Sequence, residues 1–154
     1  MIRPFDVEHL SVERLLSEWR WLVPEPAALV ARNAFGDLFM RNEAGRVFKL
    51  EVSIGQLSEI AESEDEFRAM SAMAEKRQQW FGEADENAAA ERGLSPNALQ
   101  CIAFKTPLVF AESGMPENVY VADLYEQVAF LGDLNRQLSG LADGTKVRLN
   151  VKKS

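Results

Sequence analysis

Residues 28–50 read ALVARNAFGDLFMRNEAGRVFKL, and this stretch decides the fold class. It holds three short apolar runs separated by turn residues. The runs lie at 29–31, 38–40 and 47–50, and the turns contain Gly36-Asp37 and Glu43-Ala44-Gly45. Short apolar runs punctuated by glycine and acidic residues are typical of antiparallel strands joined by tight loops. We therefore predict an antiparallel β-meander, extended by Gln56-Leu57-Ser58.

Apolar residues at helical spacing flank this meander on both sides. They predict helices over 11–22, from residue 63 onward, over 83–92 and over 124–138. Pro24 ends the first of these, because proline cannot continue a helix. Two of the others begin with capping patterns, Ser63 with Glu66 and Asp123 with Glu126, in which side chains satisfy the free N–H groups of the first turn. The residues expected to be buried along the second helix are Phe67, Met70, Met73 and Ala74, with Trp80 and Phe81 near its end.

Further strands are expected in the second half of the chain. They lie at 99–104, at 118–122 and, after the Asp143-Gly144 turn, at 146–151. Cys101 falls inside the first of these apolar runs, where a cysteine behaves as a small buried hydrophobic residue. A chain of 154 residues can bury one sizeable core. We predict a single α+β domain, 1–154, with a mainly antiparallel sheet of about five to seven strands flanked by helices.

The charge of the chain is negative and unevenly distributed. The net charge is −7, and residues 51–91 hold eleven acidic residues against Arg68, Lys76 and Arg77. Such a balance disfavours direct binding to nucleic acid or to an anionic membrane, because like charges repel, and it favours a basic partner. The N-terminal residues do not resemble a signal peptide, and a lone cysteine fits a reducing compartment. We therefore expect a cytoplasmic protein.

Residues that carry chemistry are sparse. One histidine, His9, and one cysteine cannot supply a zinc site of the usual composition. The acids between Glu62 and Glu66 lack the spacing of a calcium-binding loop, and the glycines occur singly rather than in a phosphate-binding pattern. Many pairs of carboxylates are available, and their spacing in the sequence does not show which of them meet. We expect no catalytic residue, no metal site and no cofactor.

A series of short motifs occurs in an order typical of one bacterial family. The motifs are WRWL at 19–22, FGDLF at 35–39, GRVF at 45–48, GQL at 55–57, IAES at 60–63, EF at 66–67, CIAFKTP at 101–107, ENVY at 117–120, FLGDL at 130–134 and DG at 143–144. Each motif alone reflects only turns and core positions. In this order, from about residue 11 to 149, the chain resembles the C-terminal domain of Tdi-type immunity proteins of the type VI secretion system, which are grouped with SMI/KNR-like immunity domains.

The resemblance implies a protein that binds and neutralises a toxin, typically a DNase effector injected by sibling cells, without catalysis of its own. A cognate nuclease with a basic surface would meet an acidic surface on this chain. The residues we predict for that surface are Glu59, Glu62, Glu64, Asp65, Glu83, Asp85 and Glu86. Two alternatives remain open. One is a regulatory or scaffold domain of the SMI/KNR type, and the other is a carboxylate-dependent hydrolase, which would need a deep pocket with convergent acids.

Overall fold

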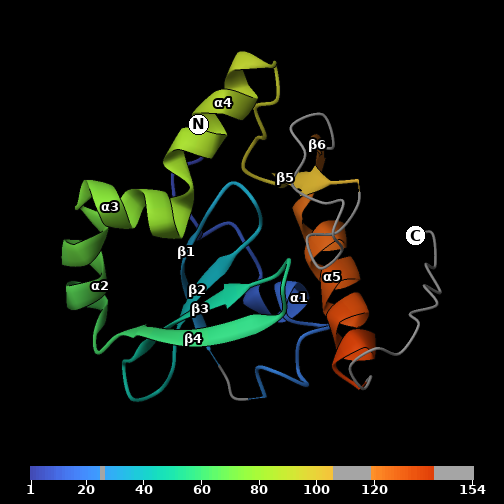
Figure 1. Ribbon diagram of the computed structural model, residues 1–154. Coiled ribbons are helices and arrows are strands. Elements are labelled where there is room, and N and C mark those ends of the chain that lie inside the picture. The colour runs from blue at the N-terminus through green and yellow to red at the C-terminus, as the bar shows by residue number, and fades with distance from the viewer. Residues whose placement is uncertain (25–26, 106–118, 141–154) are drawn as a thin grey trace.

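The predicted meander forms a four-stranded antiparallel sheet at the centre of the computed structural model (Figure 1). The structure describes residues 1–24, 27–105 and 119–140. The strands follow one another in the order β1-β2-β3-β4 and have the bounds Ala28–Arg32, Leu38–Arg41, Val47–Glu51 and Gln56–Ala61. Turns join neighbouring strands directly, so each strand pairs with the next one in the sequence, as the alternation of apolar runs and turn residues predicts.

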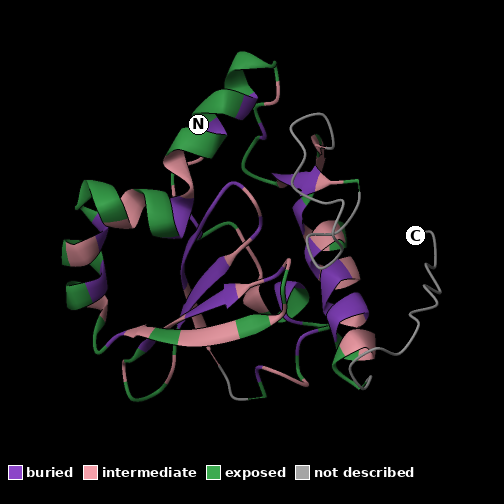
Figure 2. Cartoon of the chain, viewed as in Figure 1, coloured by how far each residue is buried: buried purple, intermediate pink, exposed green. Residues whose placement is uncertain are grey.

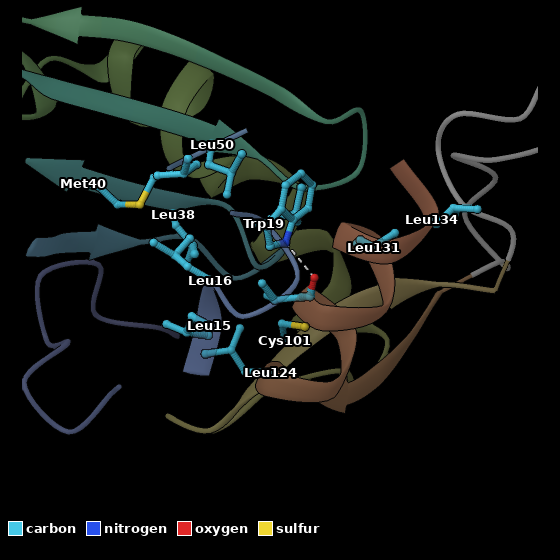
Figure 3. Packing of buried hydrophobic residues seen from close by; sticks show 13 residues of the cluster. Leu15, Leu16, Trp19, Leu38, Met40, Leu50, Cys101, Leu124, Leu131 and Leu134 are labelled. Atoms are coloured by element: carbon cyan, nitrogen blue, oxygen red, sulfur yellow. Dashed lines mark hydrogen bonds between the residues drawn. The ribbon is translucent and has the colours of Figure 1, made fainter. Parts of the chain in front are cut away.

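Both faces of this sheet are buried. Successive side chains of a strand point to opposite faces, so Leu38 and Met40 enter one core while Phe39 enters another. The first core also contains Trp19 and residues of the C-terminal helix (Figure 3). The second core is aromatic, because Phe39 stacks on Phe67 with their ring centroids 5.3 Å apart. The buried residues gather in the centre of the molecule between these layers (Figure 2).

A helical segment follows the sheet, and its part up to Phe81 covers the aromatic face. It consists of α2 (Glu64–Ser71), the short α3 (Ala74–Lys76), the π-helical turn η1 (Arg77–Phe81) and α4 (Glu83–Glu91). The predicted start is confirmed, because the Glu66 N–H donates to Ser63 Oγ at 3.1 Å. Trp80 and Phe81 are buried as predicted. Met73 and Ala74 are exposed instead, because Met73 adopts an extended conformation that separates α2 from α3 and turns both side chains outward.

The first helix is much shorter than the spacing of its apolar residues predicts. α1 covers Val12–Leu15 only, and the chain then continues in turns. Trp19 explains the difference. Its indole N–H donates to the C=O of Val128 at 2.8 Å, and its side chain is fully buried (Figure 3). A tertiary hydrogen bond and burial against the C-terminal helix therefore decide the conformation here, and helical propensity does not.

The remaining strands form a second, separate sheet. β5 (Gln100–Phe104) and β6 (Val119–Asp123) pair antiparallel with each other, so the six described strands are divided between two sheets. The mixed α+β class is confirmed, whereas a single sheet is not. The long helix α5 (Leu124–Ser139) follows β6 directly, and the Glu126 N–H donates to Asp123 Oδ2 at 3.0 Å as predicted. The strand predicted at 146–151 lies outside the described residues.

Cys101 and the helices bear on two further expectations. Cys101 is fully buried, and burial raises the pKa of its thiol to about 12, so it behaves as the hydrophobic residue we predicted. In the described ranges, no helix has both the length and the apolar composition that are needed to cross a bilayer.

Candidate functional site

The predicted toxin-binding carboxylates fall into two groups. Glu59 lies in β4, Glu62 follows that strand, and Glu64 and Asp65 begin α2, whereas Glu83, Asp85 and Glu86 begin α4. α3 and η1 lie between the groups in the chain. α2 and α3 occupy the side of the molecule away from α5, whereas β4 crosses the molecule and its start lies near α5 (Figure 1). The uneven charge of the sequence is therefore also uneven in space.

Several of these carboxylates are paired with arginines. The distances are 3.1 Å for Glu59 with Arg46, 3.3 Å for Glu64 with Arg68, 3.6 Å for Glu64 with Arg41 and 3.3 Å for Glu83 with Arg77. All four pairs are partly exposed, so each contributes about 1 kcal/mol or less to stability. Their larger effect is on the surface, where they reduce the negative charge that a partner would meet.

Three of the predicted acids remain exposed without such a pair in the described part of the chain. Glu62 and Asp65 flank the start of α2, and Asp85 lies in the first turn of α4. Asp85 accepts a hydrogen bond from Gln78 Nε2 at 3.2 Å. These three side chains are the predicted contacts that no described arginine pairs with at the surface.

Glu86 does not belong to this surface. Only 6% of it is exposed, and its Oε2 accepts a hydrogen bond from the Ile2 N–H at 2.7 Å. The prediction was wrong for a geometric reason, since Glu86 and Ala89 lie three residues apart on the face of α4 that packs inward. Glu86 holds the N-terminal segment to α4.

A cleft of about 550 Å³ adjoins the second acidic group, and our sequence reasoning did not find it. It opens between the β1–β2 turn, the end of β3, the segment from η1 to α4, and the second sheet. Polar groups of both signs and aromatic side chains line it together. Among them are Asp37, Lys49, Glu51, Trp80, Asp85 and Arg92. The only indication of this cleft in the sequence was Gly36-Asp37, which we interpreted as a turn without a further role.

The polar groups inside the cleft are engaged in holding the fold. Asp37 Oδ2 accepts from Asn33 Nδ2 at 2.9 Å, and Asp37 Oδ1 accepts from the Val52 N–H at 3.0 Å. Burial raises the pKa of Asp37, although both hydrogen bonds and the nearby Lys49 act in the opposite direction. Lys49 Nζ donates to the C=O of Gln79 at 3.2 Å and lies 3.8 Å from Glu51. Through these hydrogen bonds, Asp37 and Lys49 connect the β1–β2 turn, the chain around β3 and the turn η1.

No group of three or more histidine, cysteine, aspartate or glutamate side chains with the arrangement of a metal site occurs within residues 1–24, 27–105 and 119–140. Neither the family models nor the curated proteins searched contain a match to the chain. The immunity family therefore stays a prediction that rests on the ordered motifs.

Proposed function

We propose that this chain neutralises a basic toxin protein, a nuclease of the kind delivered by type VI secretion, by forming an inhibitory complex with it in the cytoplasm. The observation that supports the proposal best is the one-sided position of the acidic segment. Residues 51–91 carry a net charge of −8, and two of the helices they form, α2 and α3, lie on the side of the molecule away from α5 (Figure 1). A negative side attracts a basic partner and orients it before contact.

The acids without an arginine partner would form the most favourable new interactions with a basic protein. Glu62 and Asp65 have no arginine within ion-pair distance among the described residues, so a lysine or arginine of the toxin would add a new interaction there. At Glu59 and Glu64, a toxin residue would first have to displace an existing pair. We therefore place the centre of the electrostatic contact at the corner between β4 and α2.

Hydrolysis by paired carboxylates is supported less well. The cleft supplies the pocket that this alternative needs, and Asp37 supplies an acid with a raised pKa. Both oxygens of Asp37 nevertheless accept hydrogen bonds from the protein itself. Asp37 therefore already holds the β1–β2 turn, and a hydrolase of this type needs a second acid placed with it around the substrate.

The proposal is tested with the product of the gene next to this one in its source genome. Production of that protein alone should kill cells if it is a nuclease, and production of both should restore growth and give a complex that co-purifies. The double variant Glu62→Lys, Asp65→Lys should weaken the complex about tenfold or more and reduce its dependence on salt.

Glu18→Lys is the matched control, because Glu18 is an exposed carboxylate outside the acidic segment. It changes the net charge by two units at one position and should alter the affinity much less. The double variant reverses two charges, so an effect of Glu18→Lys about half as large, in free energy, would show that only total charge matters and would remove the β4–α2 corner as the contact. A neighbouring protein that is harmless, or that never binds, would refute the immunity role itself.

A further inference from the structure

β4 is an outer strand of the central sheet, and one of its two edges has no partner strand among the described residues. It pairs with β3 along Gln56–Ala61. Throughout the described ranges, no backbone hydrogen bond joins β4 to any other element. The opposite edge of the sheet differs, because there the Arg32 N–H of β1 donates to the C=O of Pro4 at 2.9 Å. An open edge offers a row of free N–H and C=O groups to another strand.

The first part of this edge is regular. Four consecutive pairs, from Glu51 with Gln56 to Phe48 with Glu59, keep one register. The register shifts only beyond Glu59, where Ile60 is passed over and Ala61 pairs with Val47. Natural edge strands are usually protected by charged side chains, especially lysine, by proline, by β-bulges or by a covering segment. Residues 56–59 read QLSE and contain neither lysine nor proline.

The side chains around the edge are accessible and acidic. Gln56 and Glu59 are exposed, and Leu57 and Ser58 are half-buried, so the strand is drawn in the colours of intermediate and exposed residues (Figure 2). Glu62 and Asp65 continue the exposed acidic surface just beyond the end of β4. Leu57 also lines a small apolar hollow of about 120 Å³ together with Met40 and Phe48. Leu57 and Glu59 are two residues apart in β4, so both side chains lie on one face of the sheet. An extended peptide with basic side chains at alternate positions would present all of them to that face, because alternate residues of a strand point to the same side.

We propose that the open edge of β4 captures an extended, basic segment of the partner as an additional strand of the sheet. This inference rests on the proposed function and describes how the partner is bound. Backbone hydrogen bonds attach the partner segment, and the acids beside β4 select for positive charge. Strand addition is a recurrent mode of peptide recognition in which main-chain bonds give affinity and side-chain pockets give specificity. The occupant is a segment of a protein, and its essential features are an extended backbone and lysine or arginine at alternate positions.

The test uses an eight-residue peptide of alternating lysine and valine, with the full-length protein labelled for NMR. The peptide should shift the amide signals of Gln56–Glu59 and slow their exchange with solvent, because new hydrogen bonds protect backbone N–H groups. The matched control is the same peptide with alternate amides methylated. It keeps every charge and side chain but cannot complete the strand ladder, and it should bind at least tenfold more weakly.

The variant Glu59→Lys tests the same contact by changing the protein instead of the peptide. A lysine at this position places a positive charge on the edge, so the basic peptide should lose tenfold or more in affinity, while Glu18→Lys should bind it nearly as wild type does. Circular dichroism of both variants shows whether the fold is retained, which we expect because both side chains are exposed.

The results of these experiments distinguish a failure of strand addition at β4 from a failure of the immunity role. Equal affinity of the methylated peptide, or signal shifts at Asp37 and Trp80 in the cleft instead of β4, would overturn strand addition. A toxin complex that forms and protects cells while the β4 amides stay unchanged would also overturn it, and the immunity role would stand. Protection of the β4 amides by the peptide, combined with a harmless neighbouring protein, would support the edge and refute the immunity role.

Discussion

Asp37 connects the β1–β2 turn to the chain beyond β3. Its carboxylate bonds to Asn33 within the turn and to Val52 beyond β3, so it ties two loops of the sheet together. Burial raises its pKa above the ordinary value of 3.8. The folded state therefore holds the Asp37 proton more tightly than the unfolded chain does. Its contribution to the free energy of unfolding is greatest below about pH 4 and falls as the pH rises through the folded-state pKa.

Asp37→Asn tests this linkage. The amide cannot accept at both positions, so the variant should lose about 1–2 kcal/mol of unfolding free energy at pH 4. The difference from wild type should shrink towards pH 7, because wild type alone carries the cost of the buried charge there. Urea unfolding between pH 4 and pH 7 measures it, with the exposed variant Glu18→Gln as control. A difference that grows with pH would contradict the raised pKa.

Glu86 marks the limit of prediction at the scale of the residue. The sequence places it in an acidic helix start, where solvent exposure is the usual outcome for glutamate. Its burial depends on Ile2, whose N–H lies 84 positions away in the chain. No local pattern contains that partner. Glu59 and Glu83 are similar cases, because tertiary packing sets their arginine partners, whereas the pair of Glu64 with Arg68 follows the i,i+4 spacing of a helix.

At the scale of the element, the approach of α5 to the segment after α1 depends on one glycine. A Cβ added at Gly132 would lie 2.6 Å from the C=O oxygen of Glu18 and 2.9 Å from Trp19 Nε1. The absence of a side chain therefore allows Trp19 to reach Val128. Two effects of Gly132→Ala oppose each other, since alanine favours the helix by up to about 1 kcal/mol while overpacking costs about 1–3 kcal/mol.

We expect the steric effect to dominate, because the nearest atom belongs to the backbone and cannot rotate away. Gly132→Ala should lower the unfolding free energy by about 1–2 kcal/mol, measured by urea denaturation, and should change the fluorescence of Trp19. Gly140→Ala is the matched control at the end of the same helix, where the added Cβ would meet only Gln137 O at 3.8 Å. Stabilisation by Gly132→Ala would show that the contact relaxes.

Elements whose signals are local were predictable. The meander, the starts of α2 and α5, and the strands β5 and β6 were all found from turn residues, capping residues and apolar runs. α1 was not, because the spacing of Leu15, Leu16 and Trp19 fits a helix while the position of the tryptophan is set by α5. The break between α2 and α3 at Met73 could not be predicted, because no glycine or proline occurs there in the sequence.

At the scale of the whole molecule, Arg32 joins the two sheets. Its guanidinium is buried and donates to the C=O groups of Asn33, Ala98 and Gln100, at 3.1, 3.1 and 2.6 Å. Ala98 and Gln100 lead into β5, and the Ile102 N–H adds a bond to the C=O of Ala34 at 2.7 Å. One side chain of β1 thereby positions the second sheet, which as a two-stranded unit would be marginal alone.

Arg32→Lys keeps the charge but cannot form the fork of bonds. It should cost about 2–3 kcal/mol, because carbonyl groups are left without a donor. Hydrogen exchange in β5 and β6 should accelerate more than in β2 and β3. Arg92→Lys is the control, since Arg92 is exposed, and it should stay within about 0.5 kcal/mol of wild type. A uniform loss of protection over both sheets would show that Arg32 supports the whole core and not the junction.

The sequence by itself determined the α+β class, the order of the described strands, two helix caps and the acidic segment, because these depend on residues within a few positions of one another. Only the tertiary structure decided that the strands form two sheets, that Glu86 and Arg32 are buried, that arginines pair with several of the acids, and that a cleft and an open edge lie next to the acidic surface. These features depend on contacts between distant segments, such as Trp19 with Val128. Burial and pairing are therefore properties of the packed molecule, whereas turns, caps and net charge can be predicted from the chain.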